Sequence, residues 1–226
     1  MSSALNVQIF ENTLKLEKVQ VEIENVVAAA DLNQHLDLDA ILQVTPGAKY
    51  NPERFPGLVY KLKRPKTTTL LFASGKMVCT GAKSARSGKR AIVQVINKLT
   101  HNGIVIIARP DAKIENIVAC ADLHGIVDLE NVAERLFKTI YEPEQFPALI
   151  YRMNEPKVVF LVFASGKIVC TGAKKESDVY SAVEKLRDTL ELNRLITRNK
   201  SPRKERNPTH HENKNNTAQV SLPVPL

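Results

Sequence analysis

Apolar and polar residues alternate with a period of two in several short segments of this chain, which is typical of half-buried β-strands. The first such segment runs through Val19, Val21 and Ile23, each followed by a polar residue. Three more follow near 57–63, 67–73 and 76–81, and Pro65 and Gly75 mark the turns between them. The pattern therefore predicts one strand followed by a three-stranded meander.

Two other segments have the period of an α-helix. A short helix is predicted after Asp37, a residue suited to an N-cap, with apolar Leu38, Ile41 and Leu42. A longer amphipathic helix closes the region, with Ala91, Ile92, Val95 and Leu99 on one face. The prediction so far is a strand, a short helix, a meander and a long helix.

The whole arrangement occurs twice. When the chain is shifted by 91 positions, residues 24–83 and 115–174 share 30 identities in 60 without a gap. The helix positions are copied as well, with Asp128, Leu129, Val132, Ala133 and Leu136 in the short helix and Ala182, Val183, Leu186 and Leu190 in the long one. We therefore expect an N-terminal extension (1–18), two similar halves (19–109 and 110–198) and a disordered basic tail (199–226).

Strand alternation separates two faces of the meander. Leu71, Ala73, Met77 and Cys79 form a face of the kind that packs under helices. The opposite face combines apolar, aromatic and polar residues, namely Thr68, Leu70, Phe72, Lys76, Val78 and Thr80. This pattern predicts an α+β fold that keeps its helices on one side of a sheet and uses the open side for binding.

Composition narrows the class of protein. No apolar run approaches the 18 residues of a membrane span, and the first residues lack the basic and apolar regions of a secretion signal. Three cysteines without a Cys-x-x-Cys pair favour a reducing compartment over a disulfide scaffold or a zinc site. The net charge of +8 favours a polyanionic partner, most often nucleic acid.

The chain contains segments that resemble enzyme motifs, but none of them has the residues that the motif requires. Ser74-Gly75-Lys76 and Ser165-Gly166-Lys167 lack the preceding glycine of a phosphate loop and have Met77 and Ile168 where Ser or Thr is required. None of the five histidines has a copy in the other half, and no nucleophilic triad or metal-ligand spacing is repeated. We expect no enzyme, no cofactor and no metal.

Blocks 50–56 and 72–83, with their copies 141–147 and 163–174, resemble the TATA-binding protein family, and the resemblance covers residues 19–192. It implies a saddle of two halves, with a curved antiparallel sheet of about ten strands and helices on the convex face. It also implies a general transcription initiation factor that binds and bends TATA-box DNA through the minor groove. Its partners would be a transcription factor B-type protein and, indirectly, RNA polymerase. The short N-terminus looks archaeal, which implies a nucleoid-associated cytoplasmic protein; a eukaryotic member would be nuclear.

The resemblance also assigns roles to individual residues. Four phenylalanines match the family's DNA wedges: Phe55, Phe72, Phe146 and Phe163. The floor that contacts base edges would comprise Asn25, Val27, Leu70, Val78 and Thr80 with Asn116, Val118, Leu161, Val169 and Thr171. Phosphates would be bound by Lys61, Lys66, Ser74 and Lys76 with Arg152, Lys157, Ser165 and Lys167.

The two halves differ in charge. Residues 46–101 contain twelve basic residues and one acidic residue, whereas 137–192 contain eight of each. We expect the second-half loop with Glu142, Glu144 and Gln145 to receive the factor B-type partner, as the resemblance implies. The basic helix with Arg86, Lys89 and Arg90 is left for an acidic factor or for flanking DNA.

Two alternatives remain open at this stage. The duplicated sheet with four phenylalanines could serve as an RNA-binding or protein-interaction module, because exposed aromatic rings also stack on single-stranded bases. In the absence of DNA, the apolar open face could form a homodimer, because a large apolar patch is costly to leave in water.

Overall fold

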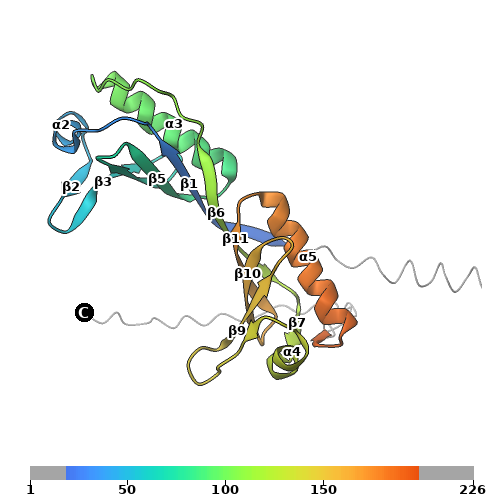
Figure 1. Ribbon diagram of the computed structural model, residues 1–226. Helices are drawn as coiled ribbons and strands as arrows, with labels where there is room; N and C mark the ends of the chain where they lie inside the picture. The colour runs from blue at the N-terminus through green and yellow to red at the C-terminus, as the bar shows by residue number, and fades with distance from the viewer. Residues whose placement is uncertain (1–18, 199–226) are drawn as a thin grey trace, which may run out of the picture.

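The computed structural model describes residues 19–198, which fold as two copies of one pattern (Figure 1). The first half consists of β1 (Val21–Asp31), α2 (Leu38–Val44), β2 (Lys49–Asn51), β3 (Phe55–Leu62), β4 (Thr67–Phe72), β5 (Lys76–Ala82) and α3 (Ala85–His101). The second half consists of β6 (Lys113–Asp122), β7 (Gly125–Val127), α4 (Leu129–Arg135), β8 (Thr139–Ile140), β9 (Ala148–Met153), β10 (Val158–Phe163), β11 (Lys167–Ala173), α5 (Glu176–Leu192) and β12 (Ile196–Arg198). None of these helices is long and apolar enough to cross a membrane.

Ten of these strands form one antiparallel sheet in the order β2-β3-β4-β5-β1-β6-β11-β10-β9-β8. The order is symmetric about its centre, where β1 of the first half pairs with β6 of the second. Asn25 lies opposite Val118, and Val27 lies opposite Asn116. The two halves of the repeat are therefore related by an approximate twofold axis that passes between these strands. Figure 1 shows the two arms of the sheet meeting at β1 and β6, which gives the predicted saddle.

The helices cover one face only, as the alternation predicts. Leu71, Met77 and Cys79 are fully buried with the apolar faces of α2 and α3, and Phe160 is the largest fully buried side chain of the second half. Val26 and Ala82, although part of the first half, pack in the core of the second. The central strands therefore belong to both hydrophobic cores.

Polar caps begin the two short helices where the sequence predicts. The Asp37 carboxylate accepts a hydrogen bond from Ala40 N, and the Asp128 carboxylate accepts one from Asn131 N. Ser84 and Ser87 form a reciprocal capping box at the start of α3. The equivalent N-cap of α5 is Lys175, whose side chain makes no capping hydrogen bond.

Some elements differ from the expectation. The first strand of the meander is expected near 57–63, but β3 already begins at Phe55, because Asn51 pairs with Phe55 and closes a hairpin with the edge strand β2. Strands β7 and β12 were not expected; they pair across about 70 residues of sequence, and their three-residue length leaves no periodicity to detect. The expected extension (1–18) and basic tail (199–226) lie outside the described residues.

Candidate nucleic-acid interface

The helix-free face of the sheet, called here the concave face, carries the predicted base-contact residues. Cross-strand partners lie on the same face of a sheet, and the register pairs Leu70 with Val78 and Thr68 with Thr80. In the second half Leu161 pairs with Val169, and Thr171 pairs with Val118. All of these side chains are partly exposed. The structure therefore brings the predicted floor together on one surface.

Two asparagines lie at the centre of this surface, each held in one orientation. The Asn25 Oδ1 atom accepts hydrogen bonds from Gly81 N at 2.7 Å and from Thr80 Oγ1 at 3.2 Å. The Asn116 Oδ1 atom accepts the matching bonds from Gly172 N at 2.8 Å and from Thr171 Oγ1 at 3.3 Å. Because the backbone N–H groups require an acceptor, each carboxamide oxygen points to the glycine. The Asn116 NH2 group also donates to Thr171 Oγ1 at 3.2 Å, which uses one of its two hydrogens and leaves the other as a donor. Such donors suit a ligand that offers only acceptors.

Four phenylalanines form two pairs, one on each arm of the concave face. Phe55 and Phe72 have ring centroids 5.9 Å apart at 64°, and Phe146 and Phe163 have centroids 6.5 Å apart at 63°. Phe55 is 39% exposed and Phe146 is 42% exposed, which is unusual for such large apolar side chains. These four rings are thus not core residues, and each arm carries an edge-to-face aromatic pair at its outer part.

A glycine permits the tighter of the two pairs. A Cβ atom at Gly57 would lie 2.7 Å from Phe55 Cε1 and 3.0 Å from Phe72 Cε1. The equivalent residue of the second half is Ala148, and there the rings lie farther apart. The missing methyl group at Gly57 therefore allows the first-half rings to approach each other more closely.

Exposed basic side chains surround this surface. Lys61, Lys66, Lys76, Arg152, Lys157 and Lys167 are all exposed, and none of them forms an ion pair with another described residue. Ser74 and Ser165 are exposed in the turns that precede β5 and β11. The six cations are therefore available to an anionic ligand.

A second, matched feature escaped the sequence analysis. Lys83 Nζ lies 2.6 Å from Glu24 Oε2, and Lys174 Nζ lies 2.8 Å from Glu115 Oε2. The hydrogen bond from Lys174 lowers the pKa of Glu115, and the bond to Glu24 raises the pKa of Lys83. The signal was present, since all four residues are repeated at a spacing of 91. These ion pairs remove two lysines from the set available to a ligand.

The predicted partner loop is also accessible. Glu142, Glu144 and Gln145 are exposed, and the backbone N–H groups of Gln145 and Phe146 both donate to Glu142 O. This tight turn connects β8 to β9 and carries Phe146 at its end. The loop therefore presents two carboxylates next to the wedge-like ring.

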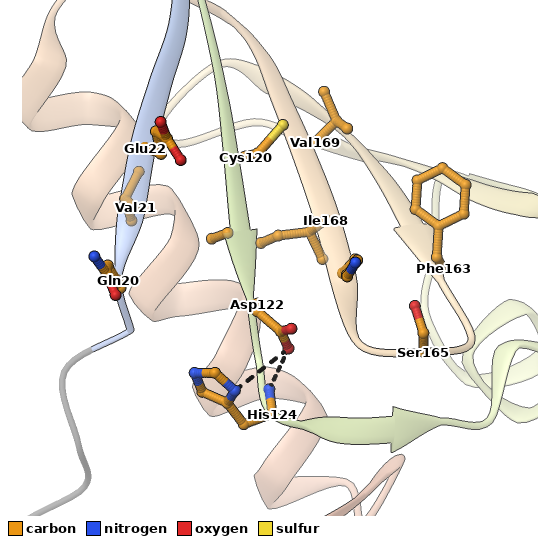
Figure 2. Close-up of a pocket in the computed structure, with 12 residues that line it drawn as sticks. Gln20, Val21, Glu22, Cys120, Asp122, His124, Phe163, Ser165, Ile168 and Val169 are labelled. Atoms are coloured by element: carbon orange, nitrogen blue, oxygen red, sulfur yellow. Dashed lines mark hydrogen bonds and ion pairs between the residues drawn. The ribbon is translucent and has the colours of Figure 1, made fainter. Parts of the chain in front are cut away.

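An open hollow of about 840 Å³ lies beside Phe163 on the concave face (Figure 2). Its lining includes Glu22 and Cys120 from the two central strands and Asp122, whose carboxylate accepts a hydrogen bond from His124 N. Figure 2 shows Glu22, Cys120 and Val169 on adjacent strands. The described residues contain no group of three or more His, Cys, Asp or Glu side chains arranged to hold a metal ion.

Comparison with known proteins decides the family. The family model described as transcription factor TFIID, or TATA-binding protein, matches residues 20–101 and again residues 111–192. The chain belongs to the TATA-binding protein family. The two matches coincide with the two copies of the fold, and the match covers both central strands.

Relatives in this family are similar along most of their length. The TATA-box-binding protein of Pyrodictium occultum is 52% identical over 179 residues, which cover 79% of this chain and 90% of the relative. That of Sulfolobus acidocaldarius is 50% identical over 173 residues, covering 76% and 88%. The solved structure titled Methanococcus jannaschii TBP matches with a TM-score of 0.69 and 44% identity, over 76% of this chain and 99% of that one. The expected saddle and the expected archaeal relationship are both confirmed.

Proposed function

We propose that this protein is a general transcription initiation factor that binds the TATA box of promoters through its concave face. The observation that carries the proposal is the pair of central asparagines, whose oxygens are both held by glycine N–H groups, so that their NH2 groups can donate to a ligand on this mainly apolar surface. In the minor groove, A·T pairs offer only acceptors, adenine N3 and thymine O2, whereas G·C pairs add an amino group. The apolar side chains of the floor give the guanine amino group no hydrogen-bond acceptor. The surface therefore selects A·T pairs both by excluding guanine and by donating hydrogen bonds to the A·T acceptors.

The exposed phenylalanine pairs support DNA bending by wedging. An aromatic ring inserted between base pairs replaces part of the stacking that is lost, and opening a step costs about a few kcal/mol. Each arm offers two rings in edge contact, and Phe55 and Phe146 are the more exposed of each pair. The six unpaired cations and the two serines then bind phosphates on both sides of the kinks, which makes the affinity depend on salt.

The loop with Glu142, Glu144 and Gln145 is proposed to receive a factor B-type protein, which in turn brings RNA polymerase. Exposed carboxylates at a rim steer a basic partner and fix its register. Because the equivalent loop of the first half carries Asn51, Glu53 and Arg54, only the second half offers this acidic surface. We also propose an archaeal protein of the cytoplasm that acts on the chromosome, in line with its archaeal relatives.

Fluorescence anisotropy with four nucleic acids tests the DNA proposal. The targets are a TATA-box duplex, the same duplex with G·C substitutions, and each single strand. The wild-type protein should prefer the TATA duplex strongly, and Phe146→Ala combined with Phe163→Ala should abolish this preference. Stronger binding to the single strands would instead favour the RNA-binding alternative. Equal binding to all targets that disappears with salt would contradict both functions.

A charge reversal tests the partner loop. Glu142→Lys with Glu144→Lys should retain binding to the TATA duplex but lose recruitment of the factor B-type protein in a gel supershift. The matched control is Glu53→Lys in the first-half loop, which should leave recruitment intact. Unchanged recruitment by the double variant would show that the partner docks elsewhere.

A further inference from the structure

The concave face carries a charge difference between its two arms that the repeat itself does not predict. Most positions of the surface are matched: Lys61 by Arg152, Lys66 by Lys157, Lys76 by Lys167 and Asp31 by Asp122. These matched charges contribute equally to both arms. A difference between the arms must therefore come from positions where the copies disagree.

Two such positions lie at the ends of one cross-strand row. In the first half the row runs Lys49, Val59, Leu70, Val78, Ala29 and Lys113. In the second half the equivalent row runs Ile140, Ile150, Leu161, Val169, Cys120 and Glu22. The apolar middle is similar in both, but lysines end the first row and a carboxylate ends the second.

The central strands exchange these charges between the halves. Glu22 belongs to β1, yet it pairs with Cys120, whose other neighbour in the row is Val169 of the second arm (Figure 2). Lys113 belongs to β6, yet it pairs with Ala29 in the first arm. Both side chains are exposed, and neither forms an ion pair with a described residue. The two residues occupy equivalent positions, 91 apart, with opposite charge.

We propose that Glu22 and Lys113 determine which way round the saddle sits on an asymmetric A·T-rich site. This inference rests on the proposed function. An A-tract has a narrow minor groove with an enhanced negative potential, whereas alternating T and A steps are more easily deformed. The first arm, with Lys113, is therefore expected on the A-tract half of the site, and the second arm, with Glu22, on the alternating half.

Fluorescence energy transfer measures the orientation directly. A donor is attached at Asn97→Cys on the exposed side of α3, in a Cys120→Ala background that copies the equivalent Ala29. Cys79 and Cys170 are buried and stay unlabelled. The acceptor is placed at one end or the other of a duplex with a T-A-T-A half and an A-A-A-A half. A self-complementary T-A-T-A-T-A-T-A site must give equal transfer at both ends and calibrates the assay.

The decisive variant is the charge exchange Glu22→Lys with Lys113→Glu, which leaves the net charge unchanged. Each reversed charge should change the orientation ratio roughly two- to fivefold, as expected for exposed ionic contacts, so the exchange should reverse the preference of the wild type. A ratio that stays constant while the duplex is still bound would overturn this inference alone. Failure of the wild type to prefer A·T over G·C duplexes would overturn the proposed function, and this inference with it.

Discussion

At the scale of single residues, the repeat gives each functional side chain a counterpart in nearly identical surroundings. The asparagine at the start of each copy is bound through its oxygen by a glycine N–H of the neighbouring strand, β5 or β11. That bond uses the oxygen of the carboxamide, and at least one hydrogen of each NH2 group stays available to a ligand, since Asn116 donates only one to Thr171 Oγ1. Exchanging donor for acceptor should therefore impair binding without removing the contact that holds the side chain.

Asn116→Asp is the corresponding test. The aspartate can still accept from Gly172 N, but it has no donor and adds a negative charge next to the acceptors of the groove. We expect the affinity for a TATA duplex to fall by about 1–3 kcal/mol or more, while the melting temperature changes little. Asn25→Asp should have the same effect, and Asn97→Asp on the exposed side of α3 serves as the control. An unaffected affinity would contradict the role of the amide.

A second test separates exposed from buried phenylalanines. Phe146→Ala should weaken binding to the TATA duplex and leave stability nearly unchanged, because the ring is 42% exposed. Phe160→Ala should instead reduce the free energy of unfolding by about 3–5 kcal/mol, because this ring is fully buried and stacks on Tyr151. Calorimetry and anisotropy on both variants measure the two effects. Similar losses of stability would mean that Phe146 is a core residue.

At the scale of elements, the two long helices start differently although they occupy equivalent places. α3 begins with the Ser84–Ser87 capping box, whereas Lys175 provides no side-chain cap for α5. Glu176, the first residue of α5, reaches across the molecular centre and accepts a hydrogen bond from Ala85 N at 2.7 Å. A carboxylate of α5 therefore lies at the N-terminus of α3. This contact is favourable, because the N-terminus of a helix favours negative charge.

The caps allow a prediction about stability. Ser84→Ala removes the acceptor for Ser87 N and should lower the free energy of unfolding by about 1 kcal/mol. Lys175→Ser introduces a side-chain cap at the start of α5, where none exists, and should raise the free energy of unfolding by a similar or smaller amount. Urea denaturation of both variants measures these changes, with Lys175→Ala as the control, because it removes the same lysine without introducing a cap. A Ser84→Ala variant as stable as the wild type would contradict the capping role.

At the scale of the whole molecule, the sheet joins two cores and exposes one continuous binding surface. Val26 and Ala82 pack in the core of the second half, so the halves are not independent modules. The concave face extends across the junction, and Cys120 lies on it between Val169 and Glu22. This thiol is the one partly exposed cysteine of the described residues, since Cys79 and Cys170 are buried.

Cys120 therefore provides a footprint of the concave face without any mutation. Burial raises the pKa of all three thiols, that of Cys170 to about 12, so alkylation is best followed near pH 9. We expect Cys120 to react first, and a TATA duplex to protect it, as measured by mass spectrometry of the modified peptides. Free protein that is already protected at high concentration, but not on dilution, would support the homodimer. Full reactivity in the DNA complex would contradict binding through this face.

Much of the fold could be predicted from the sequence because its signals are local and repeated. The alternation of Leu71, Met77 and Cys79 identifies the core face, and Asp37 and Asp128 identify the starts of two short helices. The duplicated Phe-Ala-Ser-Gly-Lys block led to the family, which the comparisons confirm. Each of these features depends on neighbours within a few positions, so periodicity and motif suffice.

The tertiary structure alone decided which charges lie on the concave face. By simple alternation Glu22 should lie on the same face of the sheet as buried Val26, four residues away, and Lys113 on the same face as buried Ile117. Register shifts at Glu24 and Glu115 interrupt the alternation, so that both side chains lie on the concave face instead. Because side chains in a strand have a period of two, one extra residue is enough to exchange the faces. Such a bulge arises from pairing between strands about 90 residues apart, so it leaves no local sign in the sequence.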